Sequence, residues 1–160
     1  MNELSKTIVP FPRILFLFFI LAGFTGLLDA GYLTVEHYRG GALTCSLVSG
    51  CQKVVTSQYS TIAGFPVSLL GVFYYLSVLL LIVILREVWD RFPPSGWREL
   101  LRRLIPVLTT VGFLFTLYLL YLMFFVIKAV CIYCLGSAFS STALFLLGIY
   151  WYHLEGVGRR

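Results

Sequence analysis

Four long stretches of the chain carry almost no charge, and this pattern restricts the possible folds more than any other feature. They cover residues 14–35, 54–85, 104–127 and 129–152, and Asp29 is the single charged residue within them. Each stretch supplies the roughly 20 apolar residues that an α-helix needs to cross about 30 Å of hydrocarbon. With 59% hydrophobic and only 12% charged residues, the composition excludes an ordinary soluble domain. We therefore predict an all-α membrane protein.

The spacing of the stretches predicts a four-transmembrane-helix bundle with one large outer loop that carries a short helix. The expected elements are a first helix over 12–35, an outer loop over 36–65 with a short helix at 51–57, and further membrane helices over 66–85, 104–127 and 131–152. The two prolines at 93 and 94 cannot continue a helix, so we read 86–103 as a solvated connector with one amphipathic turn. These elements fill the chain, and we expect a single membrane domain over 1–160 with no fused thioredoxin-like domain.

The first apolar stretch has one alternative interpretation, a cleaved signal peptide, because Lys6 and Arg13 precede it like a charged leader region. The stretch is longer than the roughly 7–15 residues of a signal core, and no clear small-x-small cleavage site follows it. A membrane helix is the better interpretation.

The basic residues predict the orientation of the bundle. Only Arg39, Lys53 and Lys128 lie on the side of the outer loop. The other nine lie on the side of both termini: Lys6, Arg13, Arg86, Arg91, Arg98, Arg102, Arg103, Arg159 and Arg160. Cytoplasmic loops collect Lys and Arg, so we expect both termini in the cytoplasm. In a bacterial inner membrane all four cysteines would then face the periplasm, where disulfides persist.

The four cysteines form two pairs, both at the predicted outer face. Cys131 and Cys134 form a CxxC motif where the fourth helix begins, and Cys45 and Cys51 lie in the outer loop. A CxxC pair closes a small disulfide ring, and the positive end of a helix dipole lowers the pKa of a nearby thiol. If the fourth helix begins close to Cys134, we expect a thiolate to be favoured there, and redox chemistry is the preferred interpretation of the motif.

Other interpretations of the cysteines remain. Cys131 and Cys134 are also compatible with a static disulfide or with two buried thiols that only pack. A zinc site is disfavoured, because the spacing of Cys45 and Cys51 is looser than a zinc knuckle and the compartment oxidises thiols, so we expect no metal. Cys45 and Cys51 also suit a purely structural loop disulfide, although Gly50 and the neighbouring glycines suggest a pair that moves.

A few further residues are candidates for a role at the site. Asp29 is the one ionisable residue within a predicted span, although solvation or hydrogen bonding near the helix end is a better interpretation than catalysis. His37 is more typical of a solvated loop histidine than of a base. Aromatic residues of the second and third helices would mostly pack or face lipid, but could also line a pocket for a ring: Phe73, Tyr74, Tyr75, Phe113, Phe115, Tyr118, Tyr121 and Phe125.

Taken together, these motifs resemble the vitamin K epoxide reductase family, in its bacterial disulfide-forming branch. The resemblance covers nearly the whole chain. It is carried by Cys45-x5-Cys51, by Ser57, by the segment FPVSLLG at 65–71, and by the CIYC motif at 131–134.

The resemblance implies a role for each motif. Cys131 and Cys134 would be the active-site pair, with Cys134 next to a quinone, either ubiquinone or menaquinone. Cys51 would attack Cys131, and Cys45 would meet the cysteine of a separate DsbA-like thioredoxin-fold protein. Ser57 would position or polarise the site around Cys134 and the quinone. The implied function is a quinone-dependent thiol:disulfide oxidoreductase that supports disulfide bond formation.

Two positions depart from the vertebrate enzymes of that family. Val67 and Ala138 stand where those enzymes carry an asparagine and a tyrosine that contact the oxygens of vitamin K, so we expect quinone reduction and not epoxide reduction. A DsbB-like quinone reductase is a rival, but it carries its CxxC in the first outer loop, the reverse of the order here. A binding or structural membrane protein with static disulfides is the alternative from a different class.

Overall fold

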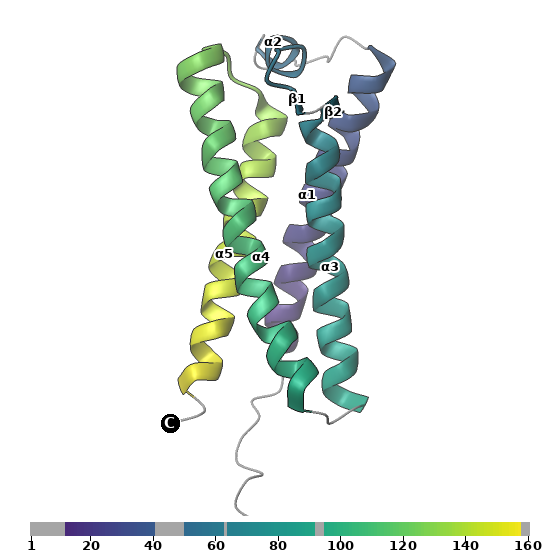
Figure 1. Cartoon of the computed structure of the whole chain (residues 1–160), viewed down its shortest axis with the longest axis vertical. Coiled ribbons are helices and arrows are strands. Elements are labelled where there is room, and N and C mark those ends of the chain that lie inside the picture. Colours follow the sequence, from purple (N-terminus) through teal and green to yellow (C-terminus); the bar gives the residue numbers. More distant parts are fainter. Residues whose placement is uncertain (1–11, 41–49, 63, 92–94, 158–160) are drawn as a thin grey trace, which may run out of the picture.

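The computed structural model describes residues 12–40, 50–62, 64–91 and 95–157, and nearly all of them are helical (Figure 1). Four helices are long and apolar enough to cross a membrane, at Arg13–Arg39, Val67–Arg86, Arg103–Ile127 and Ile132–Leu154. The prediction of a four-helix membrane bundle is therefore confirmed. One end of the bundle also carries a short helix, as expected, although it ends at Val55 and not at residue 57.

The helices and strands have the following bounds: α1 Arg13–Arg39, α2 Cys51–Val55, β1 Thr61–Ile62, β2 Phe65–Pro66, α3 Val67–Arg91, α4 Ser95–Tyr121, η1 Leu122–Ile127 and α5 Ile132–Val157. β1 and β2 pair antiparallel, with Thr61 opposite Pro66. η1 is a π-helical continuation of α4, and a Lys128 residue in the left-handed conformation ends it. A glycine at positive φ, Gly40, ends α1 in the same way.

Several boundaries differ from those expected. α1 continues to Arg39, four residues beyond the expected end, because its hydrogen-bonded turns continue beyond the apolar stretch until Gly40. The connector expected over 86–103 is largely helical, since α3 runs to Arg91 and α4 already begins at Ser95. Pro106 consequently lies inside α4, where it removes one helical hydrogen bond. The β1–β2 hairpin was not expected.

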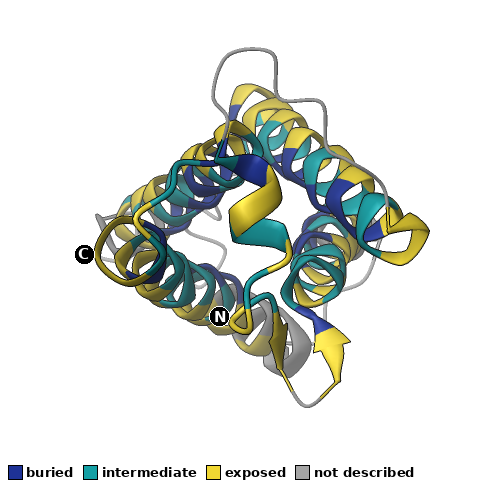
Figure 2. Cartoon of the chain, turned by 90° about the horizontal axis from the view of Figure 1, so that it is seen from above, coloured by how far each residue is buried: buried dark blue, intermediate teal, exposed yellow. Residues whose placement is uncertain are grey.

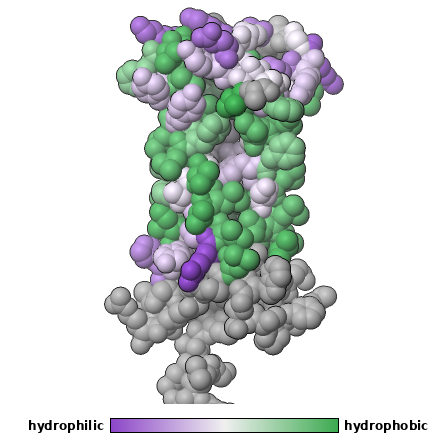
Figure 3. All heavy atoms as spheres, viewed as in Figure 1, coloured by the Kyte–Doolittle hydropathy of each residue, from purple (hydrophilic) through white to green (hydrophobic). Residues whose placement is uncertain are grey.

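The four long helices form a closed ring in which α1 packs against α3 and α5, and α4 packs against the same two helices. Seen from above, α2 lies over the middle of this ring (Figure 2). The outward surface of the helices is largely hydrophobic, while hydrophilic residues gather at the end that carries α2 (Figure 3). This distribution suits a bundle whose sides face lipid.

The two ends of the ring are filled differently. One buried core of apolar residues from all four helices extends from the boundary of the cavity, at Ala30 and Tyr75, toward the end where α1 begins; its other members are Leu15, Phe19, Val78, Ile82, Leu85, Ile105, Leu144 and Trp151. We call this part the closed half. Toward α2 the helices enclose a cavity instead, and we call that part the cavity half.

Candidate redox site

The CxxC motif lies where α5 begins. The Leu135 N–H donates to the Cys131 carbonyl at 3.1 Å, which makes Cys131 the residue that caps α5. The Cys134 N–H approaches Cys131 Sγ at 3.5 Å, as the third amide of a helix approaches a capping side chain. The expectation of a favoured thiolate at Cys134 is therefore corrected. The helix start acts on Cys131, because α5 begins at Ile132 and not near Cys134.

The environment of Cys131 favours its thiolate. Hydrogen bonding from Cys134, from its thiol first and then from its amide, lowers the pKa of the Cys131 thiol from 9.0 to about 7, against the opposing effects of burial and of the Asp29 carboxylate. Cys131 is 0% exposed. A thiolate at this position is therefore available near neutral pH but only to a group that is already packed against it.

Cys51 belongs to the same buried cluster as Cys131, together with Leu33 and Met123. It is the first residue of α2 and is 0% exposed. Cys51 is disulfide-bonded, whereas Cys131 and Cys134 are free thiols. The structure thus brings the predicted outer-loop cysteine against the predicted inner pair. Cys45, its expected partner in the loop, lies outside the described residues.

Gly50 explains how α2 comes so close to the CxxC motif. A Cβ atom at Gly50 would lie 2.5 Å from the carbonyl oxygen and 2.7 Å from the nitrogen of Val130. The backbone of Gly50 has ordinary helical angles, so the glycine is needed here for close approach. Its expected role as a flexible joint does not account for its position. Two backbones touch at Gly50 and Val130, and the next residue of each is a cysteine.

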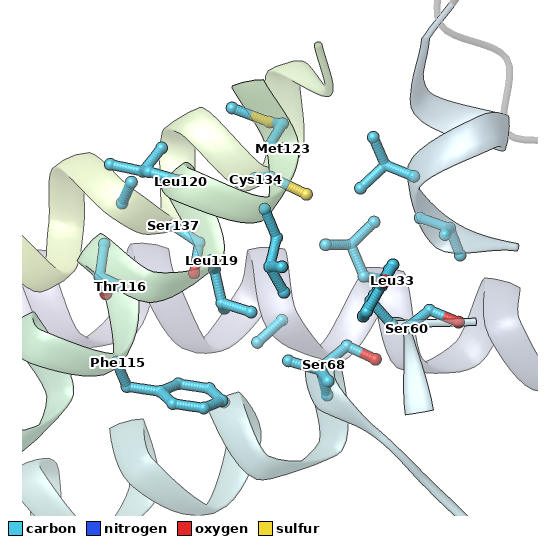
Figure 4. A pocket seen from close by; sticks show the side chains of 18 of the residues that line it. Leu33, Ser60, Ser68, Phe115, Thr116, Leu119, Leu120, Met123, Cys134 and Ser137 are labelled. Carbon is cyan, nitrogen blue, oxygen red and sulfur yellow. The ribbon is translucent and has the colours of Figure 1, made fainter. Parts of the chain in front are cut away.

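Cys134 opens into the cavity. Figure 4 shows its Sγ pointing from α5 into the cavity, which the side chains of Leu119 and Met123 also line. The cavity has a volume of about 170 Å³ and is lined by residues of α1, α2, α3, α4, η1 and α5. Its wall is largely apolar, with a few hydroxyl groups, which is the usual character of a site for a flat organic ligand.

Three residues on which the comparison with the family pattern depends also line this cavity. Ser57 is one, and its Oγ donates to the Val54 carbonyl at 2.8 Å, so it offers only lone pairs to the cavity. Val67 and Ala138, the two departures from the vertebrate pattern, also line it. Both positions therefore contact the cavity, but neither supplies a hydrogen bond from its side chain.

The eight aromatic residues singled out by sequence divide into three groups. Tyr74, Tyr75 and Phe115 line the cavity, as a pocket for a ring requires. Phe113 stacks on Phe145 at a centroid distance of 4.3 Å. The remaining four are at least half exposed on the outer surface of the bundle: Phe73, Tyr118, Tyr121 and Phe125.

Asp29 and His37 lie differently from the expectation. Because α1 is longer than predicted, Asp29 is ten residues, or roughly 15 Å, from the end of the helix. Its Oδ2 is buried without a hydrogen-bond partner, and its carboxylate lies beside Gly136 of α5. His37 is on α1 and lines the cavity, so it is not a loop residue. Neither side chain is simply solvated.

The sequence analysis did not predict the serine hydroxyls of α5 that lie near the CxxC motif. The Tyr75 hydroxyl donates to the Ser137 carbonyl at 2.9 Å and contacts the hydroxyls of Ser137 and Ser140 at 3.1 and 2.9 Å. The neighbouring Tyr74 hydroxyl and the Ser141 Oγ are buried and have no partner. The serine spacing at 137, 140 and 141 on one helix was the available signal.

Comparison with known families decides between the chemistries that this arrangement allows. The model of the vitamin K epoxide reductase family matches residues 17–149, which include α2, the cavity and both described cysteine motifs. The chain belongs to the vitamin K epoxide reductase family. Membership identifies it as a membrane thiol oxidoreductase of the vitamin K epoxide reductase type, and enzymes of this family use quinones. No group of three or more metal-ligating side chains occurs among the described residues.

Proposed function

We propose that the protein reoxidises a periplasmic thioredoxin-fold protein and passes the electrons through two cysteine pairs to a membrane quinone. One observation carries the proposal. Cys131 lies in one buried cluster with Cys51 of α2, while Cys134, its CxxC partner, opens into an apolar cavity. Three cysteines thus form a path from α2 to the cavity between the membrane helices. The alternative with static disulfides gives the cavity beside Cys134 no role.

The terminal step balances as a two-electron transfer. The Cys131 and Cys134 thiols become a disulfide and release two electrons and two protons. A quinone accepts both electrons and both protons and leaves as a quinol. The free thiols of the CxxC motif, with Cys51 in a disulfide, represent the state that precedes this step. The favoured Cys131 thiolate supports ring closure, because the thiolate is the nucleophile in disulfide chemistry.

The preceding step reduces the CxxC disulfide to two thiols. A thiolate of the reduced partner opens the loop disulfide at Cys45 and releases the Cys51 thiolate, which attacks the Cys131 sulfur of the oxidised motif, releases the Cys134 thiol and forms a Cys51–Cys131 disulfide. The second thiol of the partner then displaces Cys45, and the partner leaves with its own disulfide. The freed Cys45 attacks Cys51 and displaces Cys131, so the loop pair becomes a disulfide again. The packing of Gly50 on Val130 supports this exchange, because it holds the two cysteines in one cluster. Cys45 is assigned from the family pattern, and so is Ser57, whose place in the cavity wall supports a role near Cys134.

A redox argument supports the proposed electron acceptor, and a charge argument supports the proposed orientation in the membrane. A DsbA-like protein has a potential near −120 mV, and for a two-electron couple about 30 mV corresponds to a tenfold change in equilibrium constant. A more reducing acceptor such as glutathione would drive the reaction backwards, so a quinone, ubiquinone or menaquinone, is the suitable acceptor. The excess of Lys and Arg on the side of the termini supports cytoplasmic termini and cysteines that face the periplasm.

The proposal is tested with the full chain in lipid vesicles, mixed with a reduced DsbA-like protein and ubiquinone or menaquinone. Wild-type protein should oxidise one partner dithiol for each quinone reduced, followed by thiol trapping and by quinone absorbance. Cys134→Ser and Cys51→Ser should both reduce turnover to the uncatalysed rate. Thr142→Val is the matched control on α5, because the Thr142 hydroxyl bonds back to the Ala138 carbonyl and does not line the cavity.

A trapped intermediate also reveals the order of the steps. A reduced partner that lacks its second cysteine should open the loop disulfide of the wild-type chain and stay bound to Cys45 as a mixed disulfide, which mass spectrometry identifies. Partner oxidation that continues in both Cys51→Ser and Cys134→Ser would show that the relay does not exist.

A further inference from the structure

The deep end of the cavity contains two buried hydroxyl groups that complete no hydrogen bond. Ser141 of α5 is only 3% exposed, and neither its Oγ nor the Tyr74 hydroxyl of α3 has a partner. Both residues line the cavity into which Cys134 opens. The two hydroxyls are neighbours, but their mutual geometry is not that of a hydrogen bond. Buried polar groups are nearly always bonded, so two orphans in one cavity wall indicate a missing ligand atom.

The position of the Tyr74 hydroxyl is fixed by its neighbours. The Tyr74 ring lies where a Cβ atom of residue 112 would be, so Gly112 of α4 makes room for it. The ring also packs edge-on against Tyr75 at a centroid distance of 5.0 Å. The hydroxyl is therefore held against the wall of the cavity before any ligand arrives, and such preorganised donors lose little freedom on binding.

The helical register places these hydroxyls at a useful distance from the reactive sulfur. Ser141 follows Cys134 by seven residues, which is about two turns of α5 and roughly 10 Å along its axis on nearly the same face. The cavity wall near this interval includes apolar residues such as Phe115, Leu119 and Ala138. A six-membered ring with its oxygens fits this interval, with one edge near Cys134 and one oxygen near the two hydroxyls.

Three other hydroxyls that line the cavity already donate to backbone carbonyls. Ser57 donates to the Val54 carbonyl at 2.8 Å, and Thr116 donates to the Gly112 carbonyl at 2.9 Å. Tyr75 donates to the Ser137 carbonyl. Among the buried hydroxyls of the described cavity wall, those of Tyr74 and Ser141 are the two without a hydrogen-bond partner, and both can donate to a ligand.

We propose that Tyr74 and Ser141 together bind the quinone oxygen that lies farthest from Cys134; this rests on the proposed function. A ketone oxygen has two lone pairs and accepts one hydrogen bond from each hydroxyl. The quinol oxygen carries a proton, and a hydroxyl side chain can also accept, so the pair binds both redox states. Donors aimed at this oxygen also stabilise the negative charge that develops there as electrons arrive. The pair supplies contacts that Val67 and Ala138 cannot.

The test compares Tyr74→Phe and Ser141→Ala with wild-type full chain, using a short-chain benzoquinone as the probe. Each variant should weaken equilibrium binding roughly tenfold and raise KM by a similar factor, because each removes one donor. The infrared carbonyl stretch of bound, isotope-labelled quinone should move to higher wavenumber in both variants. Tyr118→Phe and Thr142→Val are the matched controls, since neither hydroxyl lines the cavity, and both should leave binding unchanged.

Thermal unfolding of the ligand-free protein separates ligand binding from a structural role. Removing a buried, unpartnered hydroxyl should leave Tm unchanged or raise it. A fall of Tm in both variants, or quinone affinity equal to wild type, would overturn the assignment and leave the two hydroxyls to an ordered water. If Cys134→Ser abolishes quinone reduction while Tyr74→Phe and Ser141→Ala bind normally, only this inference fails. If wild-type protein neither binds nor reduces the quinone, the proposed function fails with it.

Discussion

The closed half and the cavity half of the bundle use the same four helices for opposite purposes. In the closed half, side chains such as Phe19, Ile82 and Leu144 are 0% exposed and fill the space between the helices. In the cavity half, space of about 170 Å³ is left open, and two buried hydroxyls lack partners. The open space and the unpartnered hydroxyls of the cavity half reduce stability, and the packed side chains of the closed half compensate for this loss.

Removing side-chain volume should affect the two halves very differently. Leu144→Ala leaves a hole in the closed half and should cost about 2 kcal/mol or more of unfolding free energy, because contacts on all sides are lost. Leu119→Ala enlarges a space that already exists, so it should cost clearly less. Unfolding in detergent with and without quinone measures both. Equal losses would remove the distinction between the halves.

The close contact between α2 and the CxxC turn should be the most sensitive point of the cavity half. Gly50→Ala inserts a methyl group against the Val130 backbone and displaces Cys51 from Cys131. A displacement of about 1 Å between reacting groups reduces rates by up to roughly a hundredfold. Stopped-flow measurement of thiol exchange with a reduced partner gives the rate.

Gly31→Ala is the matched control, because a Cβ atom at Gly31 meets no heavy atom within 4 Å. The rate of this variant should equal that of wild type. If Gly50→Ala exchanges as fast as Gly31→Ala, then α2 does not need this contact for the transfer.

Adjacent tyrosines on α3 allow a finer comparison within the cavity half. Tyr75→Phe removes the hydroxyl that bonds to both Ser137 and Ser140. The free energy of unfolding should fall by about 1 kcal/mol, the usual scale for hydrogen bonds between membrane helices. The ligand-free stability of Tyr74→Phe should not fall, because its hydroxyl has no partner. Thermal unfolding of the two variants side by side measures the contrast. A larger loss for Tyr74→Phe would contradict it.

The helices of this fold could be predicted from the sequence far better than the contents of the cavity. Crossing hydrocarbon demands long uncharged stretches, and the four stretches leave little choice. Tyr74 and Tyr75, by contrast, are neighbours separated by about 100° on one helix. Which of them finds a partner depends on Gly26 of α1, Gly112 of α4 and the serines of α5, and no local pattern contains that information.

The candidate site shows the same division. The cysteine motifs and the departures at Val67 and Ala138 were visible in the sequence, because each is a spacing or a residue type. The sequence favours a thiolate at Cys134, whereas the structure favours one at Cys131. Which thiol is favoured depends on the residue at which α5 begins. Helix boundaries are uncertain from sequence by a residue or two. The depth of Asp29 was misjudged for the same reason.

The smallest expected effect is a dependence of stability on pH that originates at the CxxC motif. In the folded protein the pKa of Cys131 is lowered from 9.0 to about 7, with the hydrogen bond from Cys134 as the main cause. Between these two values the unfolded chain binds more protons at this thiol than the folded protein does, so stability must rise with pH. The contribution is complete above about pH 9 and is lost as the pH falls through about 7.

The measurement is the Tm of the reduced protein from pH 6 to pH 9.5, compared with Cys131→Ser. Wild-type Tm should rise relative to the variant across this window, since serine does not titrate there. Leu144→Ala should keep the wild-type slope at a lower Tm, because its loss arises in the closed half and involves no proton. If wild type and Cys131→Ser show parallel curves, the start of α5 does not stabilise a thiolate. The attack that closes the CxxC disulfide would then need a separate base.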